Sequence, residues 1–158
     1  PTVANEFIVP YLSEVERLQA IRKAAPDIAS HLPLLFEQGL DNPCIRAEDG
    51  ALHCLPAFFI AGAMQCGTGS LWGRLKLHGL VSSKHDAASH WWTLHPRSRA
   101  GTFDRYLGLF SSAATVAELR DQPHALLGEV SQATFTFMMA EQLRLHYLYL
   151  DAFSACHG

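Results

Sequence analysis

The residues best suited to bind a ligand form a glycine-rich segment, residues 62–71, which reads Gly-Ala-Met-Gln-Cys-Gly-Thr-Gly-Ser-Leu. Glycine lets a chain turn tightly and bring its backbone close to a ligand. Where such a loop follows a strand and opens a helix, main-chain N–H groups and the helix N-terminus together form an anion cradle. The hydroxyls of Thr68 and Ser70 add further donors. The segment therefore predicts a site for a phosphate-like anion.

Two other interpretations of this loop are open. One is a glycine-rich turn between strand and helix that binds nothing. The other is a Walker loop, G-x-x-x-x-G-K-[ST], which the glycine spacing resembles. Here, however, Thr68 stands at the lysine position and Gly69 at the Ser/Thr position. A nucleotide hydrolase needs both of those side chains, so the sequence disfavours that activity.

The flanking residues predict the elements that would position the loop. Residues 57–61 are apolar without polar alternation, which favours a strand buried on both faces and hence a parallel sheet. Apolar side chains then recur at helical spacing over residues 70–78, and Gly79 follows where a left-handed helix end is expected. Residues 58–71 are thus predicted to run from strand through turn to helix. The predicted fold class is α/β, with a short parallel sheet flanked by helices.

Periodicity predicts the remaining elements. Ser13 and Glu16 have the spacing of a capping box, and the helix that follows is expected to end at Pro26. Residues 84–99 are dense in His, Trp and Pro and predict a loop that makes specific contacts. Further helical segments are predicted at 103–110, 113–120 and 141–153, a short helix or irregular segment at 27–42, and a second buried strand at 125–130. No linker or repeat divides the chain, so 1–158 are expected to form a single domain.

The four cysteines, Cys44, Cys54, Cys66 and Cys156, do not have the spacing of a zinc site. Cys44 and Cys54 flank a short polar segment, residues 45–53, with an Asp-Gly turn. This arrangement suits a small disulfide loop, but it also suits two unrelated thiols in a reducing compartment. The spacing alone does not decide between them.

Composition excludes several classes of partner. A net charge of -3 and a pI near 6.3 give no general attraction to nucleic acid or to an anionic membrane. The longest apolar stretch, residues 55–64, is far shorter than the roughly 20 residues of a membrane-spanning helix. No secretory signal pattern is visible. Because the chain begins with Pro1 rather than Met, we expect upstream sequence beyond it.

Three histidines that recur every five residues, His85, His90 and His95, are candidate metal ligands. That spacing matches neither a helix face nor a strand face. A solvated loop with incidental histidines is the favoured interpretation, and no metal is expected.

Residues 58–71 also resemble the motif F-F-I-x-G-x-x-K-C-G-T-T-S-L of sulfotransferases that use 3′-phosphoadenosine 5′-phosphosulfate. Residues 90–93, His-Trp-Trp-Thr, resemble the K-E-P-H-W-W-T segment of carbohydrate sulfotransferases similar to N-acetylgalactosamine 4-sulfate 6-O-sulfotransferase. Further matches follow in the expected order: Asn42-Pro43-Cys44, Cys54-Leu55-Pro56, Tyr106-Leu107 with Phe110, and Gly128-Glu129 with Ser131. The resemblance spans 42–131 and implies a partial, P-loop-like sulfotransferase domain.

The resemblance implies transfer of a sulfo group from 3′-phosphoadenosine 5′-phosphosulfate to a glycan hydroxyl, without a metal. It also favours a disulfide between Cys44 and Cys54 in an oxidising lumen, the Golgi, with any membrane anchor outside this chain. The residues expected to bind the donor are Cys66, Gly67, Thr68, Gly69, Ser70 and Leu71.

Two positions depart from the family motifs. The loop lysine, which neutralises the leaving phosphate, aligns with the uncharged Gln65, and the glutamate of K-E-P aligns with Ala88. Loss of one oxyanion partner costs about 3 to 4 kcal/mol. The catalytic candidates are therefore Gln65 as a hydrogen-bond donor and His85 or His90 as the proton acceptor. The alternative is a non-catalytic fragment or degenerate homologue.

The C-terminal part departs further. Family members place an R-D-P strand before a helix resembling V-E-R-L-Y-S-D-Y-L-Y-F, whose Arg and Ser bind the 3′-phosphate. Residues 140–150 are similar to that helix, but Leu145 stands at the serine position. The chain also reaches this helix earlier than a full family domain does, so we expect an incomplete domain.

Overall fold

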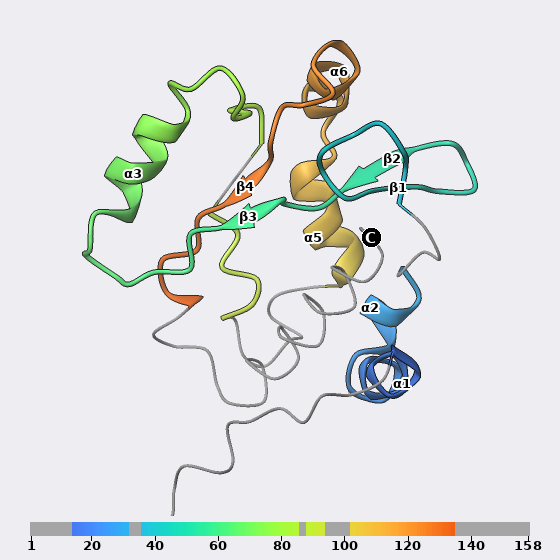
Figure 1. Ribbon diagram of the computed structural model, residues 1–158. Coiled ribbons are helices and arrows are strands. Elements are labelled where there is room, and N and C mark those ends of the chain that lie inside the picture. Colours follow the sequence, from blue (N-terminus) through green and yellow to red (C-terminus); the bar gives the residue numbers. More distant parts are fainter. Residues whose placement is uncertain (1–13, 32–35, 86–87, 94–101, 135–158) are drawn as a thin grey trace, which may run out of the picture.

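The computed structural model describes residues 14–31, 36–85, 88–93 and 102–134. It confirms an α/β fold of short strands and helices (Figure 1). The elements in chain order are α1 Glu14–Ala24, α2 Pro26–Ala29, β1 Cys44–Arg46, β2 Leu52–Cys54, β3 Phe58–Phe59, α3 Thr68–Leu75, α5 Phe103–Phe110, α6 Ala113–Asp121 and β4 Gly128–Glu129. None of the described helices is long and apolar enough to span a membrane.

The strands β3 and β4 form a two-stranded parallel sheet. Phe58 lies opposite Gly128 and Phe59 opposite Glu129, as the predicted parallel sheet requires. The strands are shorter than the predicted 57–61 and 125–130, although Ile60 N–H still donates to the carbonyl of Glu129 over 2.7 Å. The prediction of burial on both faces is wrong for β3, because Phe58 and Phe59 are only half-buried.

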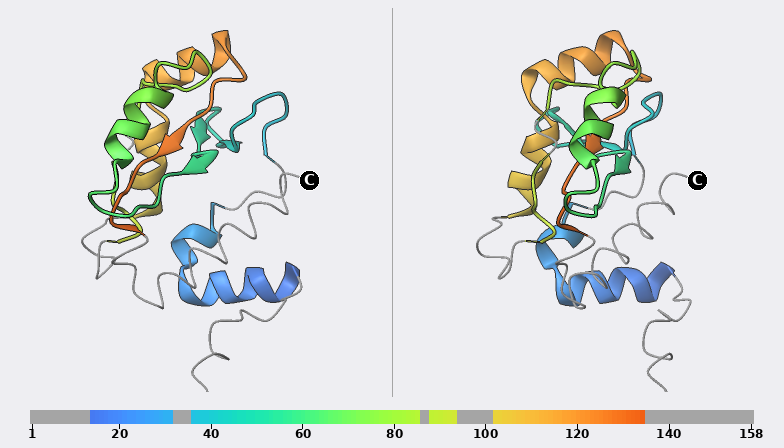
Figure 2. Two further views of the ribbon diagram at one scale, coloured as in Figure 1. Left: turned by 60° about the vertical axis from the view of Figure 1, so that its left-hand side comes forward. Right: turned by 90° about the vertical axis from the view of Figure 1, so that its left-hand side faces the viewer.

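Helices α3 and α5 lie on opposite sides of this strand pair (Figures 1 and 2). The predicted helical turns at 103–110 are confirmed as α5, and its Phe103, Tyr106, Leu107 and Phe110 are buried. Tyr106 stacks on Trp91 with ring centroids 4.9 Å apart, while Trp92 donates its indole N–H to the Tyr106 hydroxyl over 3.2 Å. The aromatic pair of the predicted 84–99 loop is therefore core that fixes the loop against α5.

The cysteine pair closes an antiparallel hairpin, β1–β2. Cys44 lies opposite Cys54 in the ladder, and the two sulfurs are bonded, which confirms the predicted disulfide. The Asp-Gly pair in the sequence predicts the turn between them, but no sequence pattern predicts the two strands. Asn42 joins this hairpin to the central strands, because its buried amide donates to Ala125 O over 2.5 Å and accepts from Leu127 N over 2.7 Å.

Helix boundaries confirm most sequence expectations. Helix α1 ends before Pro26, which begins α2, and α6 confirms the helix at 113–120. Helix α3 begins two residues before the predicted start at residue 70 and ends at Leu75. The expectation of a left-handed Gly79 is wrong, because Lys76 caps α3 in a right-handed conformation and Gly79 has no positive φ. Ser13 and the predicted helix 141–153 lie outside the described residues.

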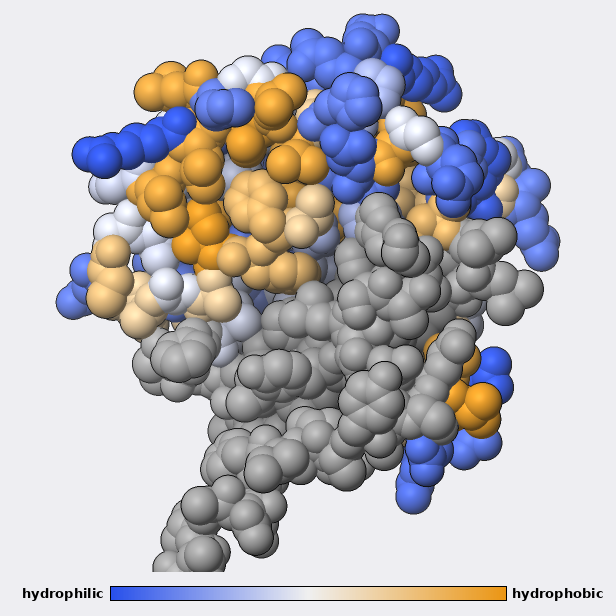
Figure 3. Space-filling view, in the orientation of Figure 1, coloured by the Kyte–Doolittle hydropathy of each residue, from blue (hydrophilic) through white to orange (hydrophobic). Residues whose placement is uncertain are grey.

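Helix α3 presents apolar side chains to the surface. Figure 3 shows hydrophobic atoms gathered over the part of the molecule where Figure 1 places α3. Leu71 is 48% exposed, and Met64, Leu77 and Leu80 near the helix ends are exposed as well.

Candidate functional site

The loop between β3 and α3 keeps part of its main chain available for a ligand. Gly67 is the N-cap of α3 with a φ of 79°, a left-handed conformation that glycine adopts without strain. The N–H groups of Cys66 and Leu71 already donate to Ala63 O and Gly67 O. Within the described chain, the N–H groups of residues 67–70 donate to no main-chain carbonyl. These amides stand at the positive end of the α3 dipole.

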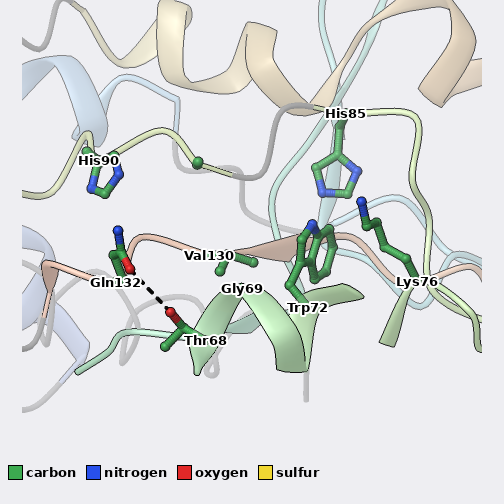
Figure 4. Close-up of a pocket in the computed structure, with 9 residues that line it drawn as sticks. Thr68, Gly69, Trp72, Lys76, His85, His90, Val130 and Gln132 are labelled. Atoms are coloured by element: carbon green, nitrogen blue, oxygen red, sulfur yellow. Dashed lines mark hydrogen bonds between the residues drawn. The ribbon is translucent and has the colours of Figure 1, made fainter. Parts of the chain in front are cut away.

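A pocket of about 400 Å³ opens beside the first turn of α3 (Figure 4). Its volume falls within the range of small-molecule sites. The residues that line it come from the loop and α3, from the segment after Ser82, and from the end of β4: Thr68, Gly69, Trp72, Lys76, His85, Ala88, His90, Val130 and Gln132. Residues far apart in sequence thus meet at one cavity.

The two histidines occupy different ends of this pocket (Figure 4). The main-chain N–H of His90 donates to Ser131 Oγ over 2.9 Å, and the next residue, Gln132, accepts from Thr68 Oγ1 over 3.4 Å. His90 therefore belongs to the Thr68 end. His85 Nε2 lies 2.8 Å from Gly128 O, and its ring packs against Trp72 with centroids 5.9 Å apart.

The proton on His85 follows from its partner. A carbonyl oxygen can only accept, so Nε2 carries the hydrogen of that bond and Nδ1 is the basic nitrogen of the neutral ring. Lys76 lies near the same end, with its Nζ 5.9 Å from the centroid of the Trp72 ring.

The pocket collects four of the predicted site residues, Thr68, Gly69, His85 and His90. Gln65 does not line it; its exposed side chain belongs to a residue with a φ of 61° two positions before Gly67. The other residues expected to bind the donor, which lie in the same loop and first turn but do not line the pocket, are Cys66, Gly67, Ser70 and Leu71. Ala88, at the position of the family glutamate, does line it.

Five of the residues that line the pocket are not among the predicted site residues: Trp72, Lys76, Ala88, Val130 and Gln132. The helical spacing of Trp72 predicts packing between helix and sheet, and no role is predicted for Lys76 or Gln132. Lys76 follows Trp72 by four residues, which places the two on one face of α3, so helical spacing would have identified it. No local pattern marks Gln132, because its place depends on the pairing of β4 with β3.

A buried glutamate lies behind the pocket wall. Glu129 is fully buried and accepts hydrogen bonds from three hydroxyls, those of Ser89 (2.5 Å), Ser131 (2.7 Å) and Tyr106. Burial raises the pKa of Glu129 above its ordinary value, because an apolar surrounding penalises the charged carboxylate, and the three hydroxyls partly oppose this.

The raised pKa of Glu129 predicts a stability that falls as pH rises. Above an ordinary pKa of 4.5 the unfolded chain releases this proton while the folded chain keeps it, so folding binds a proton in that window. The contribution is complete below 4.5 and is lost as pH rises through the folded pKa. We expect urea midpoints of the wild type, measured from pH 4 upward, to fall relative to those of Glu129→Gln. Parallel curves for the two proteins would contradict this.

Among the described residues, no group of three histidine, cysteine, aspartate or glutamate side chains is placed to hold a metal ion. Of the histidines considered for such a site, His95 lies outside the described part.

A parallel strand pair that leads through a glycine loop into a helix N-terminus beside a cavity is an arrangement of α/β proteins that bind anionic groups. Comparison of the sequence with known proteins gives a narrower result. The chain is 37% identical over 109 residues to carbohydrate sulfotransferase 15 of Mus musculus, and 34% identical over 109 residues to the protein of that name from Rattus norvegicus. It is 43% identical over 72 residues to the Homo sapiens protein of that name.

These matches support assignment of the chain to the carbohydrate sulfotransferase family. They cover 57%, 57% and 40% of this chain, but only 19%, 19% and 13% of the mouse, rat and human proteins. The chain thus spans about a fifth or less of the length of the curated relatives it matches. No protein-family model matches the chain, and no solved structure shows significant similarity to it.

Proposed function

We propose that the chain carries the donor-binding part of a sulfotransferase, which transfers a sulfo group from 3′-phosphoadenosine 5′-phosphosulfate to a glycan hydroxyl. The observation that carries this proposal is the set of N–H groups of residues 67–70, which donate to no main-chain carbonyl of the described chain and adjoin a pocket. The relatives named carbohydrate sulfotransferase 15 support the reaction class.

The donor anion would be held by the loop. Amides at the start of α3 point toward the positive end of the helix dipole, where a phosphate or sulfate ester is stabilised. Thr68 places its hydroxyl at the pocket, and its bond to Gln132 is long enough, at 3.4 Å, to be exchanged for a ligand oxygen. Gly69 lines the pocket without a side chain, so the backbone can approach the ligand closely.

Transfer also requires a proton acceptor. The acceptor hydroxyl forms a new bond from its oxygen to sulfur, the bond from sulfur to the phosphate oxygen breaks, and the hydroxyl proton passes to a base. His90 is the better candidate, because it lies at the Thr68 end of the pocket, whereas His85 is held at the other end through Gly128 and Trp72. The departing phosphate takes the electron pair and is stabilised by the loop amides.

The location follows from the same proposal. The disulfide between Cys44 and Cys54 supports an oxidising compartment, because disulfides form and persist there. We place the protein in the Golgi lumen, acting on a glycosaminoglycan-type acceptor. Immunolocalisation of the full-length protein would check the compartment.

A non-catalytic derivative is the second candidate function. Ala88 lines the pocket at the position of the family glutamate, and Gln65 replaces the loop lysine without reaching the pocket. Such a protein would bind the anion at the loop but transfer no sulfo group.

Two glycines of α3 give a matched test of anion binding. A Cβ added at Gly69 or at Gly73 meets no atom within 4 Å, so each alanine variant is expected to fold and to gain about 0.5–1 kcal/mol of helix stability. Only Gly69 lines the pocket. By calorimetry with adenosine 3′,5′-bisphosphate, we expect Gly69→Ala to weaken binding about tenfold and Gly73→Ala to leave it unchanged. Equal affinities for both variants, or no binding by the wild type at millimolar ligand, would refute the proposed site.

A further inference from the structure

Among the carboxyl groups of the described residues, Glu129 is the most deeply buried, and the proposed reaction does not use it. Its side chain is 0% exposed, and its hydrogen-bond partners are the hydroxyls of Ser89, Ser131 and Tyr106. Burial of a carboxyl group is unfavourable unless it is hydrogen-bonded, and it raises the pKa of this group. Apolar residues of similar size would fill the same space at lower cost.

Two of these hydroxyls also accept main-chain N–H groups, one from His90, which lines the pocket, and one from the next residue, Trp91. Ser131 Oγ donates to Glu129 Oε1 and accepts the N–H of His90 over 2.9 Å. Ser89 Oγ donates to the same oxygen and accepts the N–H of Trp91 over 3.1 Å. Because a hydroxyl has only one hydrogen, donating it to Glu129 turns the oxygen lone pairs toward these amides.

The segment held in this way has an unfavourable backbone conformation. His90 has a φ of 50°, in the left-handed region that residues other than glycine adopt at a cost of about 1 kcal/mol or more. Thr93 holds the other side of the residue, with its N–H and its hydroxyl both donating to the carbonyl of His90. The left-handed turn directs the His90 imidazole into the pocket wall.

We propose that Glu129 is a positioning residue for His90. Through Ser131 and Ser89 it fixes two successive amides, and so the left-handed turn that brings the imidazole to the Thr68 end of the pocket. The consequence for catalysis rests on the proposed sulfotransferase function, whereas the positioning itself does not. The hydroxyl of Tyr106, in α5, donates to Oε2 of Glu129. The other oxygen, Oε1, accepts from both serines.

The chain contains a matched control for this arrangement. Ser82 is also fully buried, donates its hydroxyl to a carboxylate, that of Glu118, and accepts the N–H of Lys84 over 3.2 Å. Ser82→Ala therefore removes the same kind of hydroxyl, between a glutamate and a main-chain amide, at a place that has no hydrogen bond to His90.

Amide hydrogen exchange of the Ser131→Ala and Ser82→Ala variants tests the positioning of His90 and does not require the protein to be catalytically active. We expect exchange of the His90 amide to accelerate about tenfold in Ser131→Ala and to stay unchanged in Ser82→Ala. Glu129→Met, which has similar size but no acceptor, should accelerate exchange at both His90 and Trp91. Glu129→Gln keeps an acceptor oxygen and should retain the protection. Equal His90 exchange in the two serine variants would overturn the proposal.

A kinetic measurement then tests the consequence. In a sulfo-transfer assay, Ser131→Ala is expected to lower kcat about tenfold with the KM for the donor unchanged, while Ser82→Ala leaves both constants unchanged. A loss of kcat shared by both variants would mean a merely structural role. If the wild type transfers no sulfo group, the proposed function fails, and the exchange result still decides whether Glu129 positions His90.

Discussion

Replacement of Gly128 by alanine is expected to destabilise the protein by about 2 to 3 kcal/mol, because it overpacks the contact between β4 and β3. An ideal Cβ at this position would lie 2.4 Å from Cζ of Phe58, and 2.7 and 2.9 Å from its Cε atoms. The ring must move, and it lies against Trp72 with centroids 6.3 Å apart. Since Trp72 lines the pocket, ligand affinity should fall as well. Chemical unfolding and calorimetry measure the two effects.

A double-mutant cycle isolates the cause. Removal of the ring in Phe58→Ala should make the additional Gly128→Ala change nearly neutral, giving a coupling free energy of about 2 kcal/mol. Gly108→Ala is the control, because a Cβ at this exposed position of α5 meets no atom within 4 Å. The explanation fails if Gly128→Ala costs no more than Gly108→Ala, or if its cost is the same with and without the Phe58 ring.

Local chemistry made much of the fold predictable. The strand, glycine loop and helix of residues 58–71 follow from apolar runs and glycines, both of which act within a few residues. Helix α5 follows in the same way from its apolar spacing, because its buried face repeats at the helical period. The Cys44–Cys54 disulfide required the family resemblance, since spacing alone left reduced thiols open.

The parts that sequence did not reveal depend on contacts between distant segments. The apolar run 125–130 predicts one strand, yet Leu126 pairs with Val81 while Gly128 and Glu129 pair with β3. In the sequence Glu129 is only part of a family match with Ser131, and its role cannot be predicted there because its partners Ser89 and Tyr106 lie 40 and 23 residues away. A charged residue inside an apolar run was the available signal, and it predicts a buried, hydrogen-bonded carboxyl group.

The positions of Gln65 and Ala88 in the structure predict the effect of reintroducing the family's lysine and glutamate at these two places. Ala88 lines the pocket, so a glutamate there would place a carboxylate opposite the anion loop, as the family motif K-E-P-H-W-W-T implies. Gln65 is exposed and two residues before Gly67, so a lysine there could extend toward the loop amides without displacing core. We expect Gln65→Lys with Ala88→Glu to raise the rate of sulfo transfer at least about 100-fold, the effect of one oxyanion partner or one general base. A radiolabelled sulfo-transfer assay with a glycan acceptor measures it.

The control for this gain is Gln122→Lys with Ala114→Glu, which makes the same two changes in charge at exposed positions of and beside α6. It should leave the rate unchanged, because neither position lines the pocket. If the restored variant binds adenosine 3′,5′-bisphosphate but transfers nothing, the loop is an anion site and the non-catalytic alternative is correct. If it binds nothing either, a lysine beside the amides of residues 67–70 has failed to create affinity, and those amides do not form a donor site. The two substitutions therefore distinguish a sulfotransferase that has lost two charged catalytic groups from a protein whose loop resembles that of a sulfotransferase but does not catalyse the transfer.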